Sequence, residues 1–95
     1  MKDRIIITRT TSVKNEFGMH ARPASQIAQI AESAQFCIWL HANSAKVDAT
    51  STLDILTLCA VNGTEVVVEI ESQNDMHVLD RIIDFFESGF GEIQG

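Results

Sequence analysis

Two strand-like segments separated by only two residues constrain the fold of this chain more than any other feature. Residues 35–42 hold a five-residue apolar run, residues 45–49 form a shorter strand-like segment, and Asn43-Ser44 joins them. Parallel strands need a crossover of about a dozen residues or more, whereas two residues suffice for an antiparallel hairpin. The pair therefore predicts a hairpin and argues against a fully parallel sheet.

Two further segments have the character of strands. Residues 4–13 are rich in β-branched side chains, which favour strands, and residues 64–72 are similar. Apolar and charged residues alternate in the later part of the second segment. We therefore expect Val68 to face the core and Glu69 to face water.

Two longer segments carry the spacing of amphipathic helices. From Pro23 to about Ala34, apolar side chains recur every three or four residues, and proline suits a first helical turn. The same spacing runs from residue 76 to about residue 88. There Gly89 is expected to close the helix and residues 90–95 to form a tail.

A third, shorter helix is predicted after Ser51. Ser51 and Asp54 have the spacing of a capping box, in which Ser51 is the N-cap. A largely apolar stretch follows and runs to Asn62-Gly63. Gly63 is expected to adopt the left-handed conformation that ends many helices.

The order of elements is strand, helix, strand, strand, helix, strand, helix, and it predicts an α+β fold. A mixed or antiparallel four-stranded sheet with helices on one face suits this order, because the central pair is a hairpin. The chain has 95 residues, of which 45% are hydrophobic. This length and this share of apolar residues suffice for one domain, residues 1–95, with one hydrophobic core.

The charge distribution excludes some classes of partner. Residues 1–47 hold six basic and three acidic side chains, whereas residues 48–95 hold one and ten. Such an acidic half argues against binding nucleic acid or anionic lipid. No apolar stretch approaches the roughly 18 residues of a membrane span, and no signal peptide is evident, so we expect a cytoplasmic protein.

The cysteines and the remaining histidines suggest no metal site. Cys37 and Cys59 lie in apolar runs and are predicted to be buried free thiols in a reducing compartment, although a disulfide between them stays open. His41 and His77 have no neighbouring ligand pattern. No metal or other cofactor is expected.

The stretch Gly18-Met19-His20-Ala21-Arg22-Pro23-Ala24 lies where a strand-like segment gives way to a helix. A neutral imidazole is a competent nucleophile, and Arg22 can neutralise a phosphoryl group. The backbone N–H groups of Ala21, Arg22 and Ala24 can accept an anion at the helix start, and Gly18 allows the backbone of another protein to come close. Alternatively, His20 is only a capping or loop residue and Arg22 is a solvated cation. The exact helix start stays open: Arg22 is the N-cap if Pro23 is the first helical residue, and His20 is the N-cap if the helix begins earlier.

The same seven residues resemble the active-site signature of HPr, the histidine phosphocarrier family of the bacterial phosphotransferase system. The resemblance extends to residues 49–53 and 62–66, and residues 86–90 are similar to the ending of the paralogue NPr. It implies an open-faced β-sandwich of four antiparallel strands with three helices on one side. It further implies that enzyme I phosphorylates His20 on Nδ1, that Arg22 is the active-site arginine, and that a IIA protein or domain receives the phosphoryl group, for sugar uptake or regulation. Such a protein is a monomeric carrier rather than an enzyme.

The resemblance gives Ser51 a second role besides helix capping. Ser51 corresponds to the serine that HPr kinase/phosphorylase modifies in some bacteria. A phosphate at an N-cap adds about two negative charges beside the helix dipole. An alternative function is therefore a protein-interaction module controlled through Ser51, and a plain N-cap is the simpler interpretation of that residue.

A docking surface is expected around the histidine. Its members are the flanking Phe17 and Met19, with Thr52, Leu53 and Leu56 of the second helix. Alternatively, Phe17 or Met19 packs over the first helix as a hydrophobic staple. The first helix has no basic residue after Arg22, and Asp54 is acidic, unlike the lysine- and arginine-rich docking faces of many HPr proteins.

Overall fold

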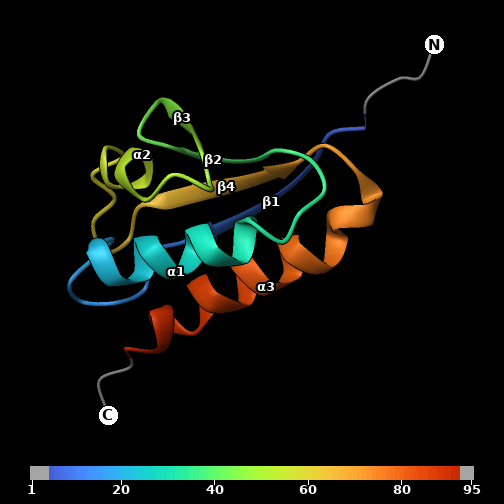
Figure 1. The fold of residues 1–95 in the computed structure, drawn as a ribbon. Helices are drawn as coiled ribbons and strands as arrows, with labels where there is room; N and C mark the ends of the chain where they lie inside the picture. Colours follow the sequence, from blue (N-terminus) through green and yellow to red (C-terminus); the bar gives the residue numbers. More distant parts are fainter. Residues whose placement is uncertain (1–4, 93–95) are drawn as a thin grey trace.

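The computed structural model of the protein describes residues 5–92, which form a sheet and a layer of helices packed together (Figure 1). The elements follow the predicted order. They are β1 (Ile7–Ser12), α1 (Ala21–Ala31), β2 (Ile38–Ala42), β3 (Ala45–Asp48), α2 (Thr52–Leu56), β4 (Glu65–Ile70) and α3 (Met76–Glu87), with 3-10 turns η1 (Gln73–Asp75) and η2 (Gly89–Gly91).

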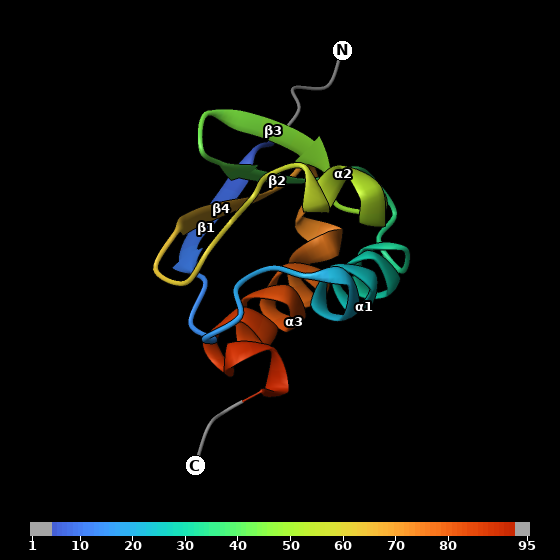
Figure 2. The same ribbon diagram turned by 90° about the vertical axis from the view of Figure 1, so that its left-hand side faces the viewer.

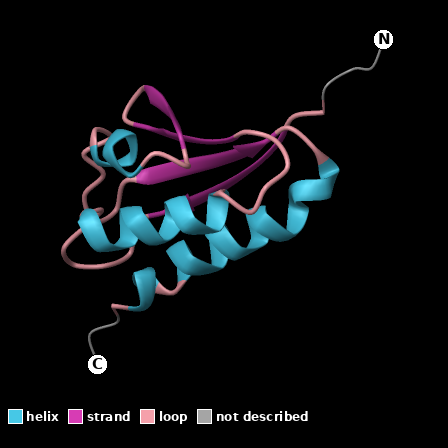
Figure 3. Ribbon diagram, viewed as in Figure 1, coloured by secondary structure: helices cyan, strands magenta, loops and turns pink. Residues whose placement is uncertain are grey.

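The four strands form one antiparallel sheet in the order β1-β4-β2-β3. The long helices α1 and α3 lie side by side beneath one face of the sheet, and α2 lies beside α1 on the same side (Figures 2 and 3). The predicted α+β open-faced sandwich is confirmed. The sheet is antiparallel throughout rather than mixed.

The β2–β3 hairpin is confirmed in detail. Asn43 and Ser44 have φ values of 52° and 67°, and Ala42 pairs with Ala45 across the turn. Two consecutive residues with positive φ are the mark of a type I′ turn, whose twist matches that of the flanking strands. The tight connection thus fixes the register of the central pair.

The core lies between the sheet and the helices, as the hydrophobic periodicity predicts. The inward side chains of β2 and β4 pack against the apolar stripes of α1 and α3, and Val68 is fully buried. The largest members are Ile27, Ile38, Leu40, Ile55, Ile70, Leu79, Ile82, Phe86 and Phe90.

Strand β2 begins at Ile38, three residues later than the sequence predicts. The backbone N–H groups of Gln35 and Phe36 donate to the carboxylate of Asp75, at 2.8 and 3.0 Å, instead of entering the sheet. Asp75 is fully buried. A carboxylate 39 positions away in the sequence therefore delays the start of β2. No pattern of neighbouring residues predicts such a contact.

The predicted boundaries of β1 and α2 also need correction. Strand β1 begins at Ile7 rather than at residue 4, and Ile5 and Ile6 are exposed. Helix α2 ends at Leu56, and Cys59, with φ of 53°, is the first residue after it in the left-handed conformation. Gly63 has a positive φ of 90°, as expected, but lies too far along the chain to end the helix. Gly63 serves the following turn, where its N–H donates to Val13 O at 2.7 Å.

Three side chains lie in environments opposite to those predicted. Cys37 and Cys59 are free thiols but are exposed, because both lie in loop segments outside the core. Glu69 points away from the core, as expected, yet it is buried on the far face of the sheet. Its carboxylate contacts His41 Nε2 at 2.7 Å and Lys46 Nζ at 3.8 Å, and these positive or hydrogen-bonding partners make its burial tolerable.

The segment after α3 is folded rather than a tail. Phe90 is buried and packs against Phe85 and Phe86, with ring centroids 5.1 and 5.0 Å apart. Its φ of 59° turns the chain back over the end of α3. This turn brings Glu92 to the N-terminus of α1; residues 93–95 of the predicted tail lie outside the described residues.

Candidate functional site

The candidate site is the N-terminus of α1, where His20 is the N-cap. His20 has an extended backbone, with φ of −135° and ψ of −173°, and α1 begins at Ala21. Of the two starts that the sequence left open, the earlier is correct. The N–H of Ala24 donates to His20 O at 3.0 Å, so it is engaged in the helix. Helix geometry leaves the N–H groups of Ala21 and Arg22 without an intrahelical partner, which narrows the expected backbone donors to these two.

Gly18 positions the loop before the helix against the protein itself. Its φ is +72°, and a Cβ there would lie 3.0 Å from Ala60 O and 3.1 Å from Val61 Cα. The next residue, Met19, donates its N–H to Ala60 O at 2.8 Å. The glycine therefore accommodates the segment after α2; the close approach of another protein's backbone stays a prediction.

Asn15 ties this loop together from the inside. Its side chain is 4% exposed, and Nδ2 donates to Gly18 O at 2.9 Å. The backbone carbonyl oxygen of Asn15 accepts hydrogen bonds from Asn62 Nδ2 at 2.8 Å and from the Gly18 N–H at 3.2 Å. These bonds hold the loop that leads to His20 against the loop that contains Asn62.

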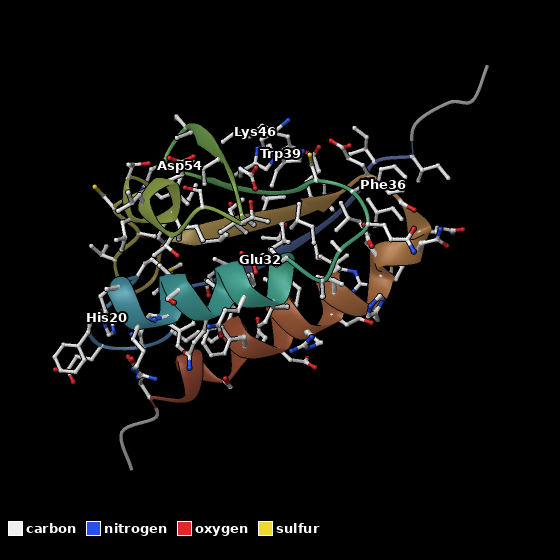
Figure 4. All side chains as sticks on the ribbon, viewed as in Figure 1. His20, Glu32, Phe36, Trp39, Lys46 and Asp54 are labelled. Atoms are coloured by element: carbon white, nitrogen blue, oxygen red, sulfur yellow. The ribbon has the colours of Figure 1, made fainter. Side chains whose placement is uncertain are left out.

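Glu92 completes the site, and sequence reasoning missed it. Its Oε2 lies 2.9 Å from His20 Nε2 and also contacts Arg22 Nη2, while Oε1 accepts from Asn15 Nδ2 at 2.7 Å. Its side chain is 9% exposed, against 40% for His20 and 54% for Arg22. The histidine and the arginine therefore converge on one anionic group. Figure 4 shows His20 at the start of α1.

The surroundings of Glu92 favour its charged form. Partial burial acts to raise the pKa of this carboxyl group, but the hydrogen bonds from Asn15 and His20, and the charges of His20 and Arg22, outweigh it. The net effect lowers the pKa of Glu92 below its ordinary value. The carboxylate is thus ionised at neutral pH and acts as a hydrogen-bond acceptor only.

The residues expected to form a docking surface separate into exposed and packed members. Phe17 is 71% exposed and meets the His20 ring edge-to-face, with centroids 6.4 Å apart, and Leu53 is also exposed. Met19 and Leu56 instead pack partly against the core, and Thr52 is half-buried. Val61, which the sequence placed inside α2, is exposed because the helix ends before it.

Ser51 is the N-cap of α2, as the capping box predicts. Its Oγ accepts the N–H of Asp54 at 3.2 Å, and its backbone is extended. Thr50, just before it, bonds Asp48 through both its N–H and its hydroxyl. The hydroxyl of Ser51 is therefore placed beside the start of a short helix.

Two kinds of site have no counterpart within residues 5–92. That part of the chain brings together no group of three or more His, Cys, Asp or Glu side chains able to hold a metal ion. Nor does it contain a helix long and apolar enough to cross a membrane.

Comparison with known proteins gives one consistent result. Residues 7–88 match the family described as the PTS HPr component phosphorylation site. The chain is 36% identical over 84 residues to the phosphocarrier protein HPr of Chlamydia pneumoniae, covering 88% of this chain and 78% of that protein. It is 32% identical over 85 residues to the phosphocarrier protein NPr of Proteus mirabilis, covering 88% and 94%. The crystal structure of HPr-C-His from Thermoanaerobacter tengcongensis superposes with a TM-score of 0.85 at 32% identity, covering 93% and 99%.

Proposed function

The chain belongs to the HPr family of phosphocarriers of the phosphotransferase system, and we propose on that basis that His20 accepts a phosphoryl group from phospho-enzyme I and passes it to a IIA protein or domain. The observation that carries this assignment is the convergence of His20 and Arg22 at the accessible N-terminus of α1. The protein is then an intermediate in phosphoryl transfer rather than a turnover enzyme, and its chemistry needs no cofactor.

Each group at the site has a distinct part in this chemistry. A ring nitrogen of His20 supplies the electron pair that forms the new bond to phosphorus. The bond from phosphorus to the donor breaks, and its electron pair leaves with the donor. Arg22 and the N–H groups of Ala21 and Arg22 stabilise the phosphoryl oxygens, which is the main task of a protein in this reaction.

The partners meet His20 across the apolar surface beside it. Phe17 contacts the His20 ring, Val61 lies beside Gly18, and both are exposed, as is Leu53 of α2. Apolar side chains of this kind form the centres of protein interfaces. Arg22 is the only basic residue of α1. A partner that is complementary to this surface therefore needs fewer acidic side chains than the partner of a carrier whose docking face is rich in lysine. We propose a cytoplasmic, monomeric carrier that serves sugar uptake, regulation or both, according to which IIA protein accepts the group.

A role for Ser51 remains a separate proposal. Modification by HPr kinase/phosphorylase would add negative charge next to Leu53, on the docking side of α2. The alternative in which the protein acts only as a Ser51-controlled binding module is less favoured. Family membership and the convergence of His20 and Arg22 on Glu92 both support the carrier.

Incubation with enzyme I and phosphoenolpyruvate tests the assignment directly. Intact mass spectrometry is expected to detect one added phosphoryl group, and brief acid treatment is expected to remove it because phosphoimidazoles are acid-labile. His20→Ala is expected to abolish the addition, whereas His41→Ala is a matched control that should keep it. Labelling that survives His20→Ala, or no labelling by the cognate enzyme I, would contradict the proposal.

A further inference from the structure

We propose that Glu92 is a positioning residue for phosphoryl transfer, which holds the proton of the His20 ring on Nε2 and leaves Nδ1 as the nucleophile. The proposal rests on the carrier function of His20 and adds a residue to it. Glu92 lies outside residues 7–88, the part of the chain that matches the family. Its role is therefore argued from contacts in this structure alone.

The contact between Glu92 and His20 determines which ring nitrogen carries the proton. Glu92 Oε2 lies 2.9 Å from His20 Nε2, within hydrogen-bond distance. An ionised carboxylate has no proton to donate, so Nε2 must be the donor. A neutral imidazole has one N–H, and the free electron pair therefore resides on Nδ1.

Glu92 is held in place by more than its contact with the histidine. Asn15 donates to its other oxygen at 2.7 Å, and Asn15 is itself buried and bonded to Gly18. Two residues before Glu92, Phe90 of the turn η2 is buried against Phe85 and Phe86 of α3. The Glu92 carboxylate is thus held by Asn15 and by the buried Phe90. A carboxylate that is held in this way can orient the His20 ring.

The carboxylate also stabilises the charge that develops during transfer. When Nδ1 forms its bond to phosphorus, the ring carries phosphorus on one nitrogen and the retained proton on the other, and so gains a positive charge. The donor leaves with the electron pair of the bond that breaks, and no proton moves. Glu92 faces the positive ring through the Nε2–H bond, and the same carboxylate binds Arg22.

Nitrogen NMR of the His20 ring tests this role without requiring phosphorylation. The unmodified protein is expected to show one tautomer, with the proton on Nε2. Glu92→Ala is expected to give a mixture of both tautomers, and Glu32→Gln is expected to leave the single tautomer unchanged. Glu32 is a suitable control because it is exposed at the far end of α1 from His20 (Figure 4).

The rate of phosphorylation by enzyme I provides the second measurement. We expect Glu92→Ala to slow it about tenfold, the range that loss of a charge-assisted hydrogen bond produces. Unchanged amide spectra around Phe90 would show that the variant keeps its fold. The same tautomer mixture with and without Glu92, or faster transfer by Glu92→Ala, would overturn the positioning role. Failure of the unmodified protein to accept phosphate would instead contradict the carrier function.

Discussion

Asn15 and Glu92 are joined by a hydrogen bond of 2.7 Å between Nδ2 and Oε1, although 77 positions separate them in the sequence. This bond connects the loop before α1 to the segment after α3, and both segments meet at His20. The histidine is therefore supported by two distant parts of the chain. The strength of that support can be measured through the ionisation of Glu92.

The pH dependence of Glu92 gives the first prediction. Its pKa is lower in the folded protein than the ordinary 4.5, so its contacts stabilise the fold above that pH and are lost as pH falls through the lower, folded value. A carbon-detected NMR titration of the Glu92 carboxyl should show a midpoint below 4.5. Asn15→Ala should move this midpoint upward, because it removes one of the bonds that favour the charged form. A midpoint that Asn15→Ala leaves in place would show that the hydrogen bond is not formed.

Substitution of Arg22 should affect transfer without affecting folding. Arg22→Gln is expected to slow phosphorylation of His20 about tenfold. That is less than the hundredfold or more attributed to an enclosed donor, because Arg22 is 54% exposed and water screens its charge. Rapid-quench measurement of the phosphorylated fraction provides the rate. Arg9→Gln, at an exposed arginine paired with Asp80, is the matched control and should transfer at the normal rate.

Glycine at position 18 should be required for packing as well as for backbone conformation. Gly18→Ala is expected to lower the free energy of unfolding by about 2–3 kcal/mol, because it adds a close contact with Ala60 O to the strain of a positive φ. Gly63→Ala has the strain without the contact and should cost about 1 kcal/mol. Urea unfolding of the two variants measures both values. Equal losses would show that the loop can move away from the added methyl group.

The buried carboxylate of Asp75 should contribute strongly to stability. Asp75→Ala leaves the N–H groups of Gln35 and Phe36 without their acceptor, and we expect a loss of about 3 kcal/mol. Asp80→Ala, which removes an exposed ion pair with Arg9, should cost less than about 0.5 kcal/mol. Urea midpoints compared at equal slope separate the two cases. A small loss for Asp75→Ala would mean that water replaces the carboxylate.

The features predicted correctly are those determined by neighbouring residues. The Asn43-Ser44 turn, the capping by Ser51 and the buried position of Val68 depend on short-range geometry and on periodicity. Pro23 and the apolar spacing beyond it also predict a helix start close to His20, although they left the N-cap open between His20 and Arg22. Local physics was sufficient for the α+β class, whereas the roles of His20 and Arg22 were predicted from the resemblance to the HPr family.

The two missed features that matter most for β2 and for the site depend on contacts between distant segments. Asp75 shortens β2 from 39 positions away, and Glu92 reaches His20 from 72 positions away. In each case an acidic side chain looks like an ordinary surface residue until the fold brings donors to it. Phe90 provided a usable signal, since a large aromatic side chain after a helix-ending glycine seldom belongs to a solvated tail.

The burial of Phe90 has a consequence for the order in which the protein becomes competent during synthesis. Residues 89–92 leave the ribosome after every element that builds the sheet and the three helices. A chain halted before them would contain His20 and Arg22, but it would lack the Phe90 ring that completes the core and the carboxylate that we propose orients the imidazole. Full reactivity would then belong only to molecules whose translation has passed this turn, and a nascent carrier would be a poor recipient of phosphate.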